Sequence, residues 1–242
     1  KGKMQIHSKQ EMDQILEELE DAKYTVEDVK RGERQKKAPL PFTTSTLQQE
    51  ASKVLNFATQ KTMRIAQQLY EGIDIKGTGT VGVITYLRTD STRISEEADQ
   101  NARAYIAGTY GEAYVSQAEK KAGDQKKIQD AHEAIRPTDV TRTPASLKDS
   151  LTREQLRLYQ LIWKRFVASR MSPARYETTS IKIAAKNYRF SVATSKIAFE
   201  GFRVVYTESE EEKEENNVVA NRIEKDAKLT KESFAAKQHF TQ

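Results

Sequence analysis

The hydrophobic pattern of this chain changes its period once, near Pro173, and this change most limits what the chain can fold into. Before Pro173, apolar residues recur every three to four positions, which is typical of amphipathic helices. After it, residues 178–183 and 188–192 alternate in a way that is typical of strands. We therefore expect a multidomain α+β protein. The break at residues 38–41 (APLP) predicts a helical domain, residues 38–172, inserted into a β-rich domain, residues 1–37 plus 173–242.

Capping residues and apolar stripes predict where the helices lie. A capping box at Ser8 predicts a helix over 9–22, and another at Ser45 predicts a second helix. The next helix is expected over about 60–71, with Tyr70 on its apolar face and Gly72 at its end. Two more are expected over 96–107, ended by Gly108, and over 153–171, with Trp163 in the core.

The remaining segments are expected to be strands and loops. Residues 24–29 read as a strand that leads into a basic linker, residues 30–37. Lys186-Asn187 reads as a turn between strands. We expect the sheet to continue through residues 199–206 and a last strand-like segment over 227–240. Lysine-containing residues 120–127 and glutamate-rich residues 208–215 are expected to form solvated loops.

The composition narrows the class of protein. The formal net charge is +5, and residues 38–172 carry 19 basic and 15 acidic side chains, so the excess lies in the middle of the chain. A basic middle suits a polyanionic partner. Without cysteine there is no disulfide, no cysteine-based zinc site and no thiol nucleophile. No apolar run approaches the roughly 18 residues of a membrane span, so we expect an intracellular protein with no membrane partner.

Residues 81–95 (VGVITYLRTDSTRIS) bring together several side chains that could take part in catalysis. An apolar run, expected to be a strand, leads to Tyr86 and then to Arg88, Thr89 and Asp90. A phenol has a pKa near 10, and a neighbouring guanidinium can stabilise its anion and neutralise phosphate oxygens. The segment therefore fits a tyrosine that attacks a phosphate. The alternative is an ordinary strand end with a surface tyrosine and a salt bridge.

Two further pairs of polar residues are candidates for the same site. His132 and Arg136 lie four positions apart, and on one helical face they would suit a phosphate. Gln67 and Glu71 are also four apart on an expected helix, and we expect them to point into the cleft of Tyr86. The alternatives are a structural histidine and a solvated helix face. The glycine-rich residues 77–82 (GTGTVG) precede a strand rather than open a helix, so we interpret them as a flexible loop and not as a dinucleotide site.

Four segments, in this order, resemble the bacterial type IA DNA topoisomerases: residues 39–49, residues 67–71 (QQLYE), residues 84–91 (ITYLRTDS) and residues 131–138 (AHEAIRPT). The resemblance implies that Tyr86 forms a 5′-phosphotyrosyl link to one DNA strand and that Arg88 contacts the scissile phosphate. It implies a DNA-phosphate contact for His132, with Arg136 in the same motif. Thr89 and Asp90 would order the site, and Gln67 and Glu71 would lie close to the tyrosine. The implied fold is a winged-helix-like (CAP-like) helical domain inserted into the β-rich arch of a four-domain toroid.

The resemblance also implies the reaction and its partners. Type IA enzymes relax negatively supercoiled DNA without ATP by cutting one strand, passing another and resealing. They use Mg²⁺ held by a Glu and an Asp-x-Asp motif, and this chain contains no Asp-x-Asp. We therefore expect a central part of a longer bacterial cytoplasmic protein, located on the nucleoid. We also expect it to be inactive alone, with single-stranded DNA, supercoiled DNA and its own remaining domains as partners.

Two other functions are alternatives. One is a non-catalytic DNA-binding hinge module. The other, a tyrosine recombinase, is disfavoured because His132 and Arg136 follow Tyr86 rather than precede it.

Overall fold

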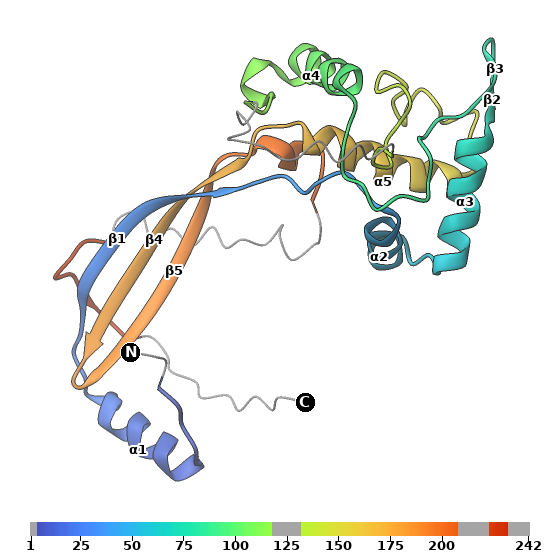
Figure 1. The fold of residues 1–242 in the computed structure, drawn as a ribbon. Coiled ribbons are helices and arrows are strands. Elements are labelled where there is room, and N and C mark those ends of the chain that lie inside the picture. The colour runs from blue at the N-terminus through green and yellow to red at the C-terminus, as the bar shows by residue number, and fades with distance from the viewer. Residues whose placement is uncertain (1–3, 118–131, 208–222, 232–242) are drawn as a thin grey trace. The chain divides into compact units, whose positions relative to one another are not determined.

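The computed structural model describes residues 4–117, 132–207 and 223–231, and these form a mixed α+β protein (Figure 1). The chain divides into two compact units. The described residues of the first unit fall within Lys1–Arg34, Tyr176–Lys196 and Glu215–Gln242. Those of the second unit fall within Gln35–Arg175 and Ile197–Glu214. Within the described ranges, none of the helices combines the length and the apolarity that crossing a membrane requires.

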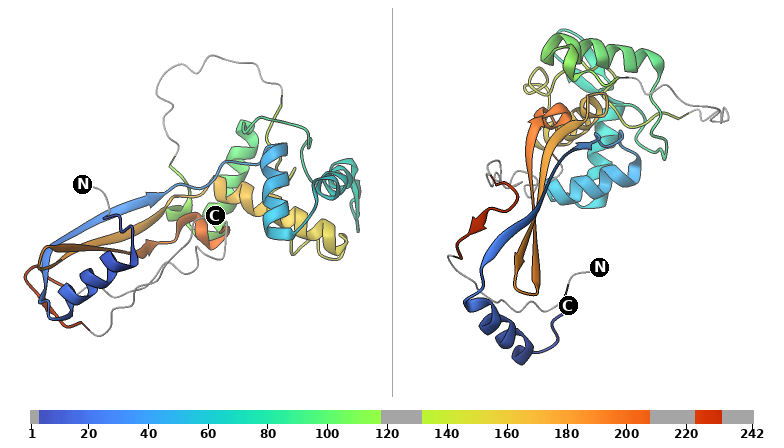
Figure 2. Two further views of the ribbon diagram at one scale, coloured as in Figure 1. Left: turned by 90° about the horizontal axis from the view of Figure 1, so that it is seen from below. Right: turned by 90° about the vertical axis from the view of Figure 1, so that its left-hand side faces the viewer.

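The main sheet has the strand order β5-β4-β1-β6. Its strands are β1 (Tyr24–Lys36), β4 (Ala174–Ala185), β5 (Tyr188–Phe199) and the short β6 (Lys228–Leu229). The three long strands run side by side in Figure 1 and in both views of Figure 2. β6 pairs antiparallel with β1, with Leu229 opposite Tyr24. The turn predicted at Lys186-Asn187 is confirmed, because Lys186 has the positive φ of 48° that lets β4 turn tightly into β5.

Helix α1 (Lys9–Glu20) packs where β4 turns into β5. Its cap is confirmed, since the Ser8 side chain accepts from the backbone N–H of Glu11. Ile15 and Leu19 on its apolar face form a buried cluster with Ala185. This small cluster fixes α1 against the end of the sheet.

Two expectations about the strands are wrong. The linker expected over 30–37 is strand as far as Lys36, because β1 is hydrogen-bonded to β4 in the sheet. Hydrogen bonds to a neighbouring strand can hold a polar segment in a sheet even when its composition does not predict a strand. The sheet does not continue through 199–206, where a short 3₁₀ helix, η2 (Gly201–Val204), buries Phe202. The loops expected over 120–127 and 208–215, and residues 232–240 of the last expected strand, lie outside the described residues.

The helical unit is built around α5 (Arg153–Ser169), which contacts both α2 (Thr44–Leu55) and α3 (Thr59–Glu71). Its capping box, Thr152 with Gln155, is confirmed. Trp163 is buried as predicted and donates from Nε1 to the carbonyl of Val140 at 2.9 Å. α4 (Glu96–Tyr110) places the ring of Tyr105 edge-on against Trp163, and the short η1 (Glu112–Tyr114) follows.

Two helix boundaries differ from the predictions. α2 is capped by Thr43 rather than Ser45, through a reciprocal pair of hydrogen bonds between Thr43 and Thr46. α4 passes through Gly108 and ends before Gly111, whose φ of 99° suits the end of a helix. Gly108 makes no close approach and has no positive φ, so it costs the helix only about 1 kcal/mol relative to alanine and does not end it.

The glycine-rich segment is a hairpin rather than a loop. β2 (Ile73–Ile75) pairs antiparallel with β3 (Gly79–Val81) directly after α3, as Figure 1 shows. The strand expected from Val81 to Tyr86 is absent: β3 ends at Val81, and the segment beyond it makes only an isolated bridge between Ile84 and Pro137. The reason is that this segment bonds to several different partners rather than to one neighbouring strand.

Candidate active site

Tyr86 lies on a segment whose side chains alternate between solvent and core. Leu87, Thr89 and Ser91 are buried, at 1%, 9% and 7% exposure. Tyr86 is 43% exposed, and Arg88 and Asp90 are exposed as well. This alternation directs the phenol, the guanidinium and the carboxylate away from the core, while the residues between them anchor the backbone.

Thr44, in the first turn of α2, holds this segment by its backbone. Its hydroxyl lies 2.8 Å from the carbonyl oxygen of Leu87 and accepts from the N–H of Thr89 at 2.8 Å. Its own N–H donates to the carbonyl of Thr89 at 2.9 Å. The buried Thr89 hydroxyl then accepts from the N–H of Ser91. Thr44 therefore fixes the backbone on both sides of Arg88, a role that the sequence analysis missed. No local signal in the sequence indicates this role, because Thr44 and Thr89 lie 45 residues apart.

The segment from 132 to 138 supplies the second anchor. The Thr85 N–H donates to the carbonyl of Arg136 at 2.9 Å, and the Thr85 hydroxyl donates to the carbonyl of Ala134 at 2.7 Å. The N–H of Thr138 donates to the carbonyl of Val83 at 3.0 Å. The expectation that His132 and Arg136 share a helical face is wrong, because this segment is irregular and bonds to the tyrosine segment instead of to itself.

The Thr44 contacts lead to a prediction. We expect Thr44→Val to lower the free energy of unfolding by about 1–3 kcal/mol, because it leaves the N–H of Thr89 without its acceptor. It should also slow any reaction of Tyr86 about tenfold, since small displacements of a reacting group are costly. Thr44→Ser keeps the hydroxyl and should restore both values. Denaturant unfolding and reaction rates measure them, with Thr78→Val at the exposed hairpin turn as the control. A Ser variant as impaired as Val would contradict this account.

Two rings flank Tyr86. Tyr70, in the last turn of α3, meets it edge-on with ring centroids 5.4 Å apart and an interplanar angle of 65°. The exposed ring of His132 lies nearly parallel to it at 6.5 Å. The structure thus brings His132 to Tyr86. The placement of Tyr70 on the apolar face of its helix was wrong, since this side chain is 40% exposed.

The charged candidates differ in their surroundings. Among the described residues, Arg88 and Asp90 form no ion pair. Arg136 is only 13% exposed and donates to the Glu133 carboxylate, with Nε at 2.8 Å from Oε2. Its guanidinium also donates to the carbonyl of Pro137. Arg136 is therefore held by its own segment, whereas Arg88 faces solvent.

The expected pair on α3 is present. Gln67 Nε2 donates to Glu71 Oε1 at 2.6 Å on the exposed surface of the helix. Tyr70 lies between these two residues in the sequence and touches Tyr86. The same turn of α3 therefore carries the Gln67–Glu71 pair and the ring contact to Tyr86.

The chain is similar to known proteins along its whole length. A family model described as DNA topoisomerase matches residues 1–242. The chain belongs to the type IA DNA topoisomerases. It is similar to full-length topoisomerase I from Thermotoga maritima, with 38% sequence identity and a TM-score of 0.77. The match covers 94% of this chain and 35% of the Thermotoga chain, so this chain spans about a third of the length of that bacterial topoisomerase.

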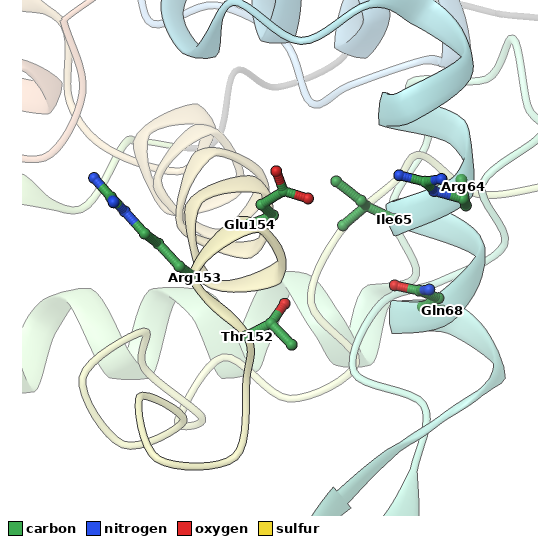
Figure 3. A pocket seen from close by; sticks show the side chains of 6 residues that line it. All are labelled: Arg64, Ile65, Gln68, Thr152, Arg153 and Glu154. Atoms are coloured by element: carbon green, nitrogen blue, oxygen red, sulfur yellow. The ribbon is translucent and has the colours of Figure 1, made fainter.

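The described part of this topoisomerase chain also contains a groove that Tyr86 does not line. It lies between α3 and the start of α5, has a volume of about 480 Å³ and is lined by Arg64, Ile65, Gln68, Thr152, Arg153 and Glu154 (Figure 3). Glu154 is paired with Lys61, and this hydrogen bond lowers the pKa of its carboxyl. Figure 3 shows Arg153 pointing away from α3. With its carboxylate neutralised by a local partner, the groove is a solvated contact between two helices.

Membership of the type IA topoisomerases implies a bound Mg²⁺ ion. The described residues do not form a binding site for it. They contain no group of three His, Asp or Glu side chains able to hold a metal ion, whereas Mg²⁺ needs near-octahedral oxygen ligands, several of them from carboxylates or water. Of the acidic candidates, Asp90 forms no ion pair among the described residues, and Glu71 is bonded to Gln67.

Proposed function

We propose that this chain carries the nucleophile of an enzyme that relaxes negatively supercoiled DNA without ATP. The observation that supports this best is Tyr86 itself. Its phenol is 43% exposed, yet its backbone is anchored on one side by Thr44 and on the other by the segment of Arg136. A nucleophile must reach its substrate and also keep its position, and this arrangement provides both.

In the proposed reaction, the Tyr86 oxygen attacks the phosphorus of a DNA phosphodiester. The tyrosyl O–P bond forms, the P–O3′ bond breaks, and the released 3′ oxygen takes up a proton while the phenol gives one up. One phosphodiester is exchanged for another, so the bond energy is conserved and the reverse step reseals the strand with no nucleotide. Arg88, exposed beside Tyr86 and without an ion pair among the described residues, neutralises the charge that shifts onto the phosphate oxygens.

The other candidates have supporting roles in this proposal. His132, stacked on the exposed side of Tyr86, contacts a DNA phosphate. Asp90 and the Gln67–Glu71 pair contribute polar groups from exposed surface, and the buried Thr89 orders the segment. Arg136 acts through its ion pair with Glu133, by holding the segment that carries His132.

The partners follow from the same proposal. The substrates are single-stranded DNA and negatively supercoiled DNA in the bacterial cytoplasm. Because this chain spans 35% of the Thermotoga chain, we propose that the activity needs the remaining domains of the intact enzyme and that the chain alone does not relax DNA. We place the ligands of Mg²⁺ outside the described residues.

The direction of the covalent bond tests the proposal. The intact enzyme is incubated with an oligonucleotide labelled at one end or the other, and the reaction is stopped with detergent. We expect the 3′-end label to stay on the protein and the 5′-end label to leave with the released fragment, because Tyr86 should hold a 5′ phosphate. Peptide mapping should place the nucleotide on Tyr86. Retention of the 5′-end label, or binding with no adduct, would overturn the assignment, and the second result would favour a non-catalytic module.

A further inference from the structure

The ring of Tyr86 is not held by the core. With 43% of the side chain exposed, core packing alone does not select its χ1 rotamer. Its described ring contacts are an edge-to-face pair with Tyr70, with centroids 5.4 Å apart, and the ring of His132 at 6.5 Å. His132 is proposed above to contact DNA. Tyr70 has no role in that scheme, yet it makes the closer ring contact.

The chain brings Tyr70 to this position through the β2–β3 hairpin. The hairpin leaves α3 after Gly72 and returns to the same helix end, where the N–H of Val83 donates to the carbonyl of Leu69 at 2.8 Å. Gly82 allows this close return, since a Cβ there would lie 2.5 Å from the carbonyl oxygen of Tyr70. The glycine-rich segment is therefore the connection that places the last turn of α3 beside the tyrosine segment.

Tyr70 lies on the exposed side of α3. Its neighbour Leu69 is fully buried, whereas Tyr70 is 40% exposed and its ring pairs with that of Tyr86. Edge-to-face aromatic pairs are directional, because the positive edge of one ring meets the negative face of the other. Such a contact favours one orientation of an exposed ring over its alternatives.

We propose that Tyr70 is a positioning residue for Tyr86: the edge-to-face pair of the two rings selects the rotamer in which the Tyr86 phenol faces the DNA phosphate. This inference rests on the proposed function and adds a residue to it. Tyr70 acts through its ring and not through its hydroxyl, so phenylalanine can replace it and alanine cannot. Its effect falls on the rate of cleavage rather than on DNA affinity.

The test compares Tyr70→Ala and Tyr70→Phe in the intact enzyme. We expect Tyr70→Ala to slow formation of the covalent adduct about 3- to 10-fold, with unchanged affinity for a single-stranded oligonucleotide. Tyr70→Phe should react like the wild type. Val54→Ala is the matched control, because Val54 is also exposed but lies at the far end of α2 from Thr44, roughly 15 Å along the helix axis.

A second measurement does not depend on activity. Fluorotyrosine at position 86 should give one ¹⁹F resonance in the wild type and in Tyr70→Phe, and a shifted or broadened resonance in Tyr70→Ala. If Tyr70→Ala lowers the melting temperature, Tyr70→Leu takes its place, since leucine fills the space without a ring edge and should show the same slow cleavage.

The outcomes separate the two hypotheses. A wild-type enzyme that forms no adduct refutes the proposed function. A normal adduct rate in Tyr70→Ala or Tyr70→Leu with an unchanged ¹⁹F spectrum refutes only the positioning role. Lower DNA affinity with a normal cleavage rate would also refute it, because Tyr70 would then be a DNA contact.

Discussion

Replacing Tyr86 with phenylalanine is expected to abolish the covalent adduct with DNA completely. The variant lacks the one oxygen that the proposed reaction requires, so no slower route through the same position remains. The fold should be unaffected, because Tyr86 is 43% exposed and its contacts to Tyr70 and His132 are made through the ring. A surface change of this kind alters the free energy of unfolding by about 0.5 kcal/mol or less.

The measurement is a detergent-stopped adduct assay beside a binding titration. Tyr86→Phe should bind single-stranded DNA as tightly as the wild type and leave plasmid supercoiling unchanged. Tyr110→Phe, which removes a hydroxyl from α4 of the same unit, is the matched control and should keep full activity. An adduct formed by Tyr86→Phe would show that another residue is the nucleophile.

Replacing Arg88 with alanine is expected to lower the rate of cleavage about 100- to 1,000-fold, the loss that follows removal of one oriented donor from a developing negative charge. The prediction depends on Arg88 being exposed beside Tyr86 with no ion pair among the described residues. Its positive charge is therefore free for the phosphate. Because Leu87 and Thr89 on each side are buried and bonded to Thr44, the backbone should keep its place in the variant.

Single-turnover cleavage measures this effect. Arg88→Lys retains the charge but not the forked geometry of the guanidinium, so we expect an intermediate rate. Arg64→Ala removes the same charge at the α3–α5 groove and should leave the cleavage rate unchanged. Equal losses in Arg64→Ala and Arg88→Ala would mean that only the overall charge matters. Arg136→Ala is expected to behave differently. If it slows cleavage as much as Arg88→Ala and also lowers the melting temperature, the ion pair of Arg136 with Glu133 has a structural role.

Several features of the fold could be read from short stretches of sequence. The helix capped by Thr152, with Trp163 in its buried stripe, and the turn at Lys186 depend on residues within a few positions of one another. The predictions were wrong where contacts between distant segments determine the local structure. β1 extends to Lys36 because it pairs with β4, a strand much later in the sequence, and the segment of His132 is irregular because its backbone bonds to Thr85.

The residues of the candidate site also fall into those that the sequence indicated and those that only the tertiary structure revealed. The sequence alone singled out Tyr86 and Arg88, because a phenol and a guanidinium two positions apart carry a recognisable chemistry, and its motifs indicated the topoisomerase family that the comparisons show. Only the tertiary structure decided which groups hold that pair in place. Thr44 bonds across 45 residues to Thr89, and Tyr70 meets Tyr86 after an intervening hairpin. Such contacts form when backbone groups from distant segments satisfy one another, so no local pattern in the sequence specifies them.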